Sequence, residues 1–198
     1  GIPRPVAGLR EGVVWVPENE AIVYTAAPCQ DRAGRVVQGD AQWLARLHLV
    51  RYRPQIIGVT GNVGKSSTKE AIGAVLSATQ QVRVGKGNLN TELGIALNIL
   101  GDWGDAYYES GGSPFFWMRV FTQGCWGVIW NPRYPRILVL EYGADAPGNI
   151  RQLVRYFQPH IAVVTAIGDV PVHVEFFENA EHVAREKSHL VSSLPLDG

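Results

Sequence analysis

The residues most able to do chemistry lie in one short stretch, the loop 60–67, which reads TGNVGKSS. It follows an apolar run and precedes a segment with helical spacing. Gly61 and Gly64 permit positive φ angles and close approach of phosphate to the backbone, and the free N–H groups at a helix start attract anions. Lys65 would reach the β and γ phosphates of a nucleotide, and the Ser66 hydroxyl would ligate Mg²⁺. The loop therefore predicts an Mg-nucleotide site.

The spacing within this loop departs from the usual phosphate-binding motif, G-x-x-x-x-G-K-[ST]. That motif requires glycine at the position of Val59, so the stretch instead has the form T-G-x-x-G-K-[ST]-[ST]. The alternative is an ordinary glycine-rich turn with a solvated lysine. If the loop binds nucleotide, its remaining members are expected to contribute as well: Thr60, Asn62, Val63 and Ser67.

Further candidate groups lie outside the loop. Glu141 ends an apolar run, where a carboxylate is either a Mg²⁺ ligand or a plain surface charge. Lys187 falls on the apolar stripe of a helical segment, which predicts a neutralised or paired amine, or one that reaches back to water. Asn88, Asn90 and Thr91 precede another helical segment, where they would cap the helix or face a ligand.

The elements that must position these groups alternate along the chain from residue 55 onward. Strands are predicted at 55–60, 81–85, 136–143 and 160–168, and helices at 65–78, 91–100, 145–157 and 179–192. This alternation predicts an α/β fold, a mostly parallel sheet with flanking helices, whose ligands gather at the carboxyl ends of the strands. The last two strands read as buried on both faces.

The N-terminal part is harder to interpret. Short strands are predicted at 12–17 and 21–26, and turns at 31–40. A helix is predicted at 40–52, ended by Pro54, and its apolar face would comprise Trp43, Leu44, Leu47 and Val50. We assign 1–39 to a fragment of a preceding region and 40–198 to a nucleotide domain that continues beyond this chain.

Composition restricts the possible partners and the compartment. Lys plus Arg and Asp plus Glu both number 18, which gives no support for a nucleic-acid surface. Cys29 and Cys125 have no metal-binding spacing, as is typical of free thiols in a reducing compartment. We expect no N-terminal signal peptide. We expect a cytoplasmic monomer.

Three segments together resemble the Mur ligases, which extend the peptidoglycan precursor. They read TGNVGKSSTKEAI, GKGNLNTELGIALNIL and LVLEYGADAPGNI, and the second is similar to the branch that adds D-alanyl-D-alanine. The resemblance covers about 40–198 with one interruption and implies the P-loop-containing central domain of that family. It also implies that Asn88 and Asn90 face ATP, and that His173 and a carbamylated Lys187 hold a second Mg²⁺. The loop before His173 is two residues longer than the family's, whereas the spacing of 14 residues to Lys187 fits.

The reaction implied by the resemblance is ATP-dependent amide-bond formation. ATP would phosphorylate a carboxylate of a UDP-N-acetylmuramoyl peptide, and the amine of D-alanyl-D-alanine would displace the phosphate. Lys65, His173 and Lys187 would be the catalytic groups. The alternatives are a folylpolyglutamate synthase-like ligase and a non-catalytic P-loop module; the guanine motif N-K-x-D is absent. Without the family's C-terminal domain the fragment is expected to be inactive.

The interruption spans about 102–135 and is rich in aromatic residues. Residues 115–130 are predicted to form a helix weakened by Gly124 and Gly127. Arg119, Thr122 and Gln123 would form its one narrow polar strip. The segment is too short to span a bilayer, so it would lie on a membrane surface or pack on protein. We interpret it as a separate addition outside the ATP site.

Overall fold

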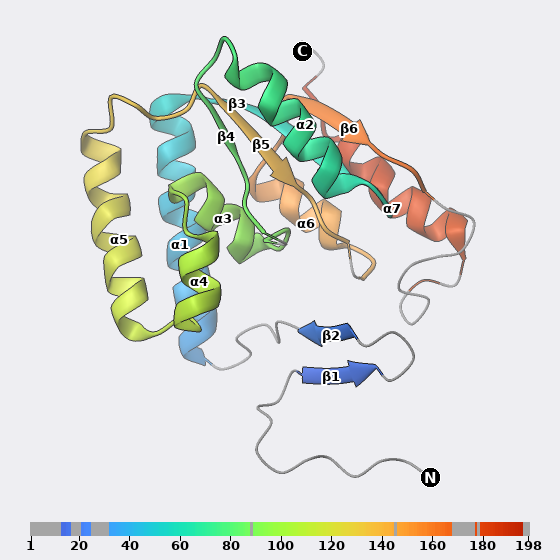
Figure 1. Cartoon of the computed structure of the whole chain (residues 1–198), viewed down its shortest axis with the longest axis horizontal. Coiled ribbons are helices and arrows are strands. Elements are labelled where there is room, and N and C mark those ends of the chain that lie inside the picture. Colours follow the sequence, from blue (N-terminus) through green and yellow to red (C-terminus); the bar gives the residue numbers. More distant parts are fainter. Residues whose placement is uncertain are drawn as a thin grey trace. The chain divides into compact units, whose positions relative to one another are not determined.

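A computed structural model describes residues 13–16, 21–24, 32–87, 89–144, 146–167, 177 and 179–195 (Figure 1). The chain divides into two compact units, Gly1–Val37 and Gln38–Gly198. Within the first unit, strands β1 (Val13–Val16) and β2 (Ala21–Tyr24) pair antiparallel, which confirms both short strands.

Helix α1 (Arg32–Tyr52) begins earlier than the sequence predicted, so the turns expected at 31–40 are wrong from residue 32 onward. Tertiary contacts outweigh the two glycines there: the side-chain amides of Gln38 and Gln42 donate to the Glu92 carboxylate at 2.6 and 2.7 Å. The helix ends two residues before Pro54, as predicted.

The buried face of α1 also differs from the prediction. Trp43 and Val50 are 64% and 72% exposed, whereas Ala41, Ala45 and His48 are buried beside Leu44. The predicted face followed the large apolar residues. The observed face also contains two small residues and one polar residue, which a pattern of large apolar residues does not single out.

The second unit is built on a four-stranded parallel sheet with the order β4-β5-β3-β6. Its strands are β3 (Gln55–Thr60), β4 (Val82–Val84), β5 (Ile137–Glu141) and β6 (Ile161–Val164). The predicted α/β class is confirmed. β5 is buried as expected, but β6 is not: it lies at an edge of the described sheet, where Ile161 and Val164 are 42% and 40% exposed.

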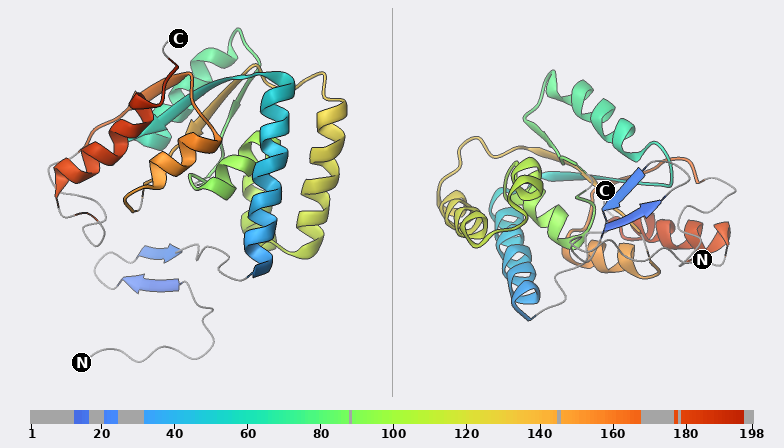
Figure 2. Two further views of the ribbon diagram at one scale, coloured as in Figure 1. Left: turned by 180° about the vertical axis from the view of Figure 1, so that it is seen from behind. Right: turned by 60° about the horizontal axis from the view of Figure 1, so that its bottom comes forward.

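Helices cover both faces of the sheet (Figure 2). Helix α2 (Lys65–Ser77) packs on one face, against Ile57, Val59 and Val139. Helices α1, α3 (Glu92–Leu100), α6 (Asn149–Tyr156) and α7 (Ala180–Ser192) share a core with Ile56 and Leu138 on the other face. This alternation of side chains along each strand is the two-residue period of a pleated sheet.

The aromatic-rich segment forms two helices, α4 (Gly104–Ser110), which was not predicted, and α5 (Pro114–Ile129), which was. The two glycines of α5 let it approach α1. A Cβ on Gly124 would lie 2.6 Å from Leu44, and one on Gly127 2.9 Å from His48. Phe116 of α5 lies in the same core as the sheet. The segment is therefore integrated into the fold, and the expectation of a separate addition is wrong in that respect.

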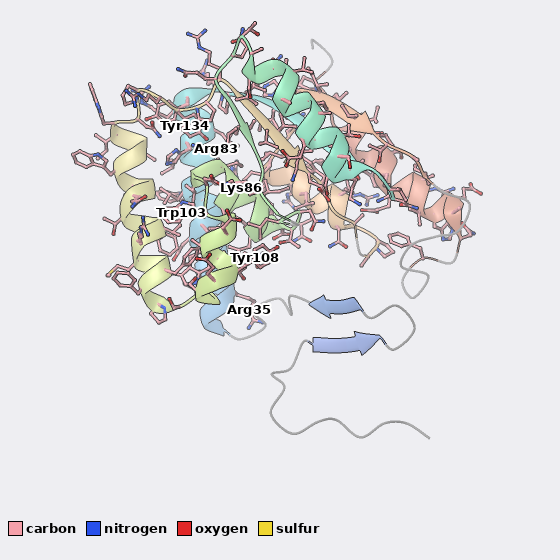
Figure 3. All side chains as sticks on the ribbon, in the orientation of Figure 1. Arg35, Arg83, Lys86, Trp103, Tyr108 and Tyr134 are labelled. Atoms are coloured by element: carbon pink, nitrogen blue, oxygen red, sulfur yellow. The ribbon has the colours of Figure 1, made fainter. Side chains whose placement is uncertain are left out.

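A polar and aromatic cluster joins this segment to the sheet (Figure 3). The Arg83 guanidinium donates to the carbonyl of Ile99 at 2.8 Å and lies 5.3 Å from the centroid of the Tyr134 ring. The Tyr134 hydroxyl donates to the same carbonyl, and its ring stacks on Tyr52 of α1 at 4.4 Å.

None of the described helices is long and apolar enough to cross a membrane.

Candidate functional site

The loop 60–67 lies where the crossover connections of the sheet diverge. After β3 the chain crosses one face through α2, and after the adjacent β5 it crosses the other face through α6. Such a topological switch point leaves a crevice outside the carboxyl ends of the two strands, and ligands of open α/β sheets bind there.

Glycine is required at both positions where the loop turns. Gly61 has φ 145°, and a Cβ on it would lie 1.8 Å from the Thr165 hydroxyl. Gly64 has φ 84° and is the N-cap of α2 without a side-chain hydrogen bond. The first N–H groups of α2 therefore have no side-chain cap, and with the helix dipole they favour an anion at this end.

The loop is held from the carboxyl end of β6. The Thr165 hydroxyl lies 2.8 Å from the carbonyl of Val63, and the N–H of Asn62 donates to the carbonyl of Ala166 at 3.0 Å. Sequence reasoning missed Thr165, although a hydroxyl just after a strand beside β3 was a usable signal. The Asn62 side-chain N–H₂ is buried without a partner among the described residues. An unpartnered donor is available for an anionic ligand.

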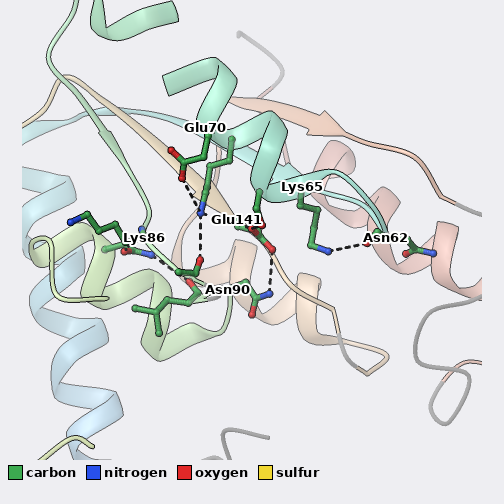
Figure 4. A network of polar contacts seen from close by, with 11 residues as sticks. Asn62, Lys65, Glu70, Lys86, Asn90 and Glu141 are labelled. Atoms are coloured by element: carbon green, nitrogen blue, oxygen red, sulfur yellow. Dashed lines mark hydrogen bonds and ion pairs between the residues drawn. The ribbon is translucent and has the colours of Figure 1, made fainter. Parts of the chain in front are cut away.

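Among the side chains of the loop, Ser66 contacts Glu141, whereas Lys65 turns towards Asn62 (Figure 4). The Ser66 hydroxyl donates to the Glu141 carboxylate at 3.0 Å, and the Lys65 ammonium donates back to the carbonyl of Asn62 at 3.3 Å. Ser67 is exposed in the first turn of α2. Thr60 lies at the end of β3, and its hydroxyl donates to the carbonyl of Tyr142 at 2.9 Å, so that side chain fastens β3 to β5.

Glu141 is the centre of this network. It is 4% exposed and lies at the tip of β5, in register with Val59 of β3. Besides Ser66 it accepts a hydrogen bond from the Asn90 side chain at 3.4 Å. A carboxylate this buried needs polar partners of this kind, because desolvation disfavours its charge.

Lys69 supplies a positive charge that sequence reasoning missed. Its side chain is 2% exposed, and its ammonium lies 4.0 Å from the Glu141 carboxylate and 3.9 Å from that of Glu70. It also donates to the carbonyl of Gly87 at 3.4 Å. Lys69 precedes Ile72 by one helical turn on the inward face of α2. The inference made for Lys187, that a lysine on the apolar stripe of a helix faces inward, therefore applies to Lys69 as well.

Asn90 and Thr91 have separate roles. Thr91 caps α3, its hydroxyl accepting from the N–H of Gly94 at 3.4 Å, which confirms the capping alternative for that residue. The carbonyl of Asn90 accepts from the N–H of Gly143, and a Cβ on Gly143 would lie 2.6 Å from the Asn90 side chain. Asn90 is thus locked beside the end of β5. Asn88 lies outside the described residues.

The Lys187 side chain is 3% exposed on α7, between Val183 and Leu190, so its predicted inward orientation is confirmed. The neighbouring Glu186 is also buried and accepts from the N–H groups of Gly148 and Ile150 at 2.9 and 2.8 Å. It therefore caps α6 from another helix.

The second metal position is not described as a whole. His173 lies outside the described residues, and within those residues no group of three or more His, Cys, Asp or Glu could hold a metal ion. A carbamate on Lys187, with His173 as its co-ligand, stays an expectation.

The residues of the loop 60–67 and Glu141 fit a nucleotide with its divalent cation. The open end of α2 and the Lys65 ammonium would bind phosphate oxygens. The Ser66 hydroxyl and the Glu141 carboxylate are oxygen ligands of the kind that Mg²⁺ prefers. Ser66 lies in the first turn of α2, after β3, and Glu141 lies at the tip of the adjacent strand β5, so the two oxygens meet at 3.0 Å.

Comparison with known proteins gives the same family as the motifs. The Mur ligase middle domain matches residues 132–198. The UDP-N-acetylmuramoyl-tripeptide–D-alanyl-D-alanine ligase of Bacillus subtilis (strain 168) is 31% identical over 182 residues, which are 92% of this chain and 31% of that enzyme. The enzyme of the same name from Escherichia coli (strain K12) is 27% identical over 73% of this chain and 25% of its own length. The chain thus spans about a third or less of these two relatives.

Solved structures agree. MurF ligase from Thermotoga maritima, solved in complex with ADP, has a TM-score of 0.59 and 29% identity over 79% of this chain and 30% of that one. MurF from Acinetobacter baumannii has a TM-score of 0.60 over 81% of this chain and 29% of that one, at 22% identity, which shows the fold. The resemblance drawn from the motifs is confirmed: this chain carries a Mur ligase middle domain and is similar to the ligases that add D-alanyl-D-alanine.

Proposed function

We propose that the protein containing this chain is an ATP-dependent ligase that joins D-alanyl-D-alanine to a UDP-N-acetylmuramoyl peptide. The observation that carries the proposal is the meeting of Ser66 and Glu141 beside the open end of α2. Together with similarity to ligases of that name, it supports a site for the phosphates of ATP. Such an enzyme would act in the cytoplasm, where ATP is made.

Different residues of the site would bind the phosphates and the Mg²⁺ during phosphoryl transfer. The first N–H groups of α2 and the Lys65 ammonium would hold the β and γ phosphates. Ser66 and Glu141 would ligate Mg²⁺, which supplies positive charge against the phosphate oxygens. The γ-phosphoryl group would pass to a substrate carboxylate, forming an acyl phosphate and ADP. The amine of D-alanyl-D-alanine would then attack the acyl carbon, and phosphate would leave as the amide forms.

No side chain of the described site is placed as a covalent nucleophile, and the reaction requires none. Phosphoryl transfer depends on positioning and on cations around the transferring group. Asn90 and Lys69 would act through Glu141, because both contact its carboxylate and not the open end of α2. We assign them to positioning. Asn88, His173 and a carbamylated Lys187 are proposed to complete the nucleotide and second Mg²⁺ sites.

The experiment is phosphate release by the full-length protein. Release should require ATP, Mg²⁺, a UDP-N-acetylmuramoyl tripeptide and D-alanyl-D-alanine together. Release with a folate and glutamate instead would favour the folylpolyglutamate synthase-like alternative. ATP binding without release in either mixture would favour the non-catalytic P-loop module. The Glu141→Gln variant, which removes the charge at the metal position, should lose at least about 100-fold in kcat.

A further inference from the structure

Helix α5 is apolar on two opposite sides, and only one of them faces the core. Its inward side is made by Phe116, Val120, Gly124 and Gly127, all buried. Its outward side carries a line of exposed apolar residues at helical spacing, which we call the outer stripe: Phe115, Met118, Trp126 and Ile129, continued by Trp130. A helix that is apolar all round is normally covered on all sides.

The polar groups on this helix do little to interrupt the outer stripe. Thr122, in the middle of it, turns its hydroxyl back to the carbonyl of Met118 at 2.7 Å. The single charged residue of α5 is Arg119, whose guanidinium lies 5.5 Å from the centroid of the Trp103 ring. Figure 1 shows α5 at an outer margin of the second unit, beside α1.

Near the C-terminal end of the outer stripe, the charged residues of the neighbouring segments are basic. Segments 41–69 and 111–140 contain no Asp or Glu, although the chain as a whole has equal numbers of acids and bases. They carry a set of exposed arginines near that end, which we call the basic rim: Arg51, Arg53, Arg133 and Arg136.

The basic rim is brought together by contacts of α1 and β3 with the end of α5 and the segment that follows it. The Tyr52 hydroxyl donates to the carbonyl of Gly127 at 2.5 Å, and the N–H of Gln55 donates to the carbonyl of Arg136 at 2.8 Å. Arg51 and Arg53 flank Tyr52, so they lie at the same end of α5 as Arg133. Among the carboxylates before this segment, Asp102, Asp105 and Glu109 lie on or just before α4, and Glu109 lines a shallow pocket with Phe115 and Arg119, in the N-terminal half of α5.

We propose that the outer stripe and basic rim dock on the surface of a bilayer that contains anionic phospholipids. Two exposed tryptophans beside arginines are the arrangement that suits the level of the lipid headgroups, where indole rings partition and guanidinium groups bind phosphates. With its inward side in the protein core, α5 would lie in the plane of the interface, held by the outer stripe and by attraction of the basic rim to anionic lipid. The contact is peripheral.

The experiment is flotation of the full-length protein with vesicles. The wild-type protein should float with vesicles of equal parts phosphatidylglycerol and phosphatidylcholine. It should float far less with phosphatidylcholine alone, or when salt rises to about 0.5 M, which screens exposed charges. The outer-stripe variant Met118→Gln/Trp126→Gln/Ile129→Gln and the rim variant Arg133→Glu/Arg136→Glu should each reduce the bound fraction at least about tenfold.

Control variants make the same kinds of substitution at exposed positions on other helices. Val75→Gln/Val191→Gln replaces exposed apolar residues on α2 and α7, and Arg155→Glu reverses an exposed charge on α6. Both should float like the wild type. All the changed side chains are exposed, and thermal melts should agree within about 3 °C.

Three results would overturn the proposal. The first is a wild-type protein that stays at the bottom of the gradient with anionic vesicles, because another part of the protein or a protein partner then covers the outer stripe. The second is a pair of variants that float as well as the controls. The third is wild-type self-association without vesicles, abolished by the outer-stripe variant, which would assign this face to a second copy.

Discussion

The Ser66 hydroxyl and the Glu141 carboxylate lie 3.0 Å apart, although 75 residues separate them in the sequence. Parallel pairing of β3 with β5 produces this contact, because it places Val59 in register with Glu141 and brings the two strand ends level. Ser66 belongs to the first turn of α2, where anions are favoured. One sheet register thus joins the proposed phosphate cradle to the proposed metal ligand.

Lys69→Met should destabilise the fold, because Glu141 would lose its nearest cation while staying buried. We expect a loss of about 2–3 kcal/mol in the free energy of unfolding, measured by denaturant titration. Glu70→Gln is the matched control. It removes the other carboxylate near the Lys69 ammonium, but Glu70 is largely exposed, so the loss should stay below about 1 kcal/mol. Equal losses in the two variants would show that the buried pair has no special weight.

Glu186→Ala should be destabilising without affecting nucleotide binding. The Glu186 carboxylate accepts from two backbone N–H groups at the start of α6, and its removal leaves them unsatisfied. The expected loss is about 2 kcal/mol. Glu181→Ala, in the exposed pair with Arg185 on the same helix, should cost less than about 1 kcal/mol. A large fall in ATP affinity in Glu186→Ala would contradict a purely structural role.

Stability should depend on pH through His48. Burial lowers the pKa of this imidazole below its ordinary value of 6.5; a hydrogen bond with the carbonyl of Gly124 opposes the shift, and Arg83 adds to it. Below pH 6.5 the unfolded chain therefore binds more protons than the folded one. The free energy of unfolding should fall as pH drops from there towards the lowered pKa.

The measurement for His48 is unfolding at a series of pH values between about 8 and 5. His48→Phe keeps a ring between α1 and α5 but cannot titrate. Its stability should be less steep in pH over this window than that of the wild type, whatever its absolute value. Parallel curves for the two proteins would assign the pH dependence to other groups.

The sequence predicted what depends on local pattern. The strands, the helix 65–78 and the glycine positions of the loop follow from periodicity and from backbone freedom. The predicted buried face of α1 was wrong because Ala41, Ala45 and His48 are buried there, and a hydrophobicity pattern gives small and polar residues little weight. The capping of α6 by Glu186 could not be predicted, because it depends on how two helices lie against each other. Lys69 was predictable, since it lies on an apolar helical stripe.

Lys187→Ala should lower kcat of the full-length enzyme at least about 100-fold, if a carbamate on this lysine helps to hold a second Mg²⁺. Added short carboxylates should restore part of the activity, because they return an anion to the space left by the Lys187 side chain. Lys187→Arg should not restore it, since its guanidinium keeps a positive charge and does not form a carbamate. Circular dichroism should confirm that both variants fold. Full activity in Lys187→Arg would exclude the carbamate.

Calorimetric titration with Mg-ATP tests the central claim, that the loop 60–67 binds nucleotide phosphates. The titration compares the wild-type protein with Lys65→Ala and with Arg155→Ala, whose exposed side chain on α6 lies away from the loop. Lys65→Ala should lose at least about tenfold in affinity, because the ammonium proposed to contact the β and γ phosphates is gone, while Arg155→Ala binds as the wild type does. Equal ATP affinity in Lys65→Ala and the wild type would contradict the nucleotide site and the ligase function built on it.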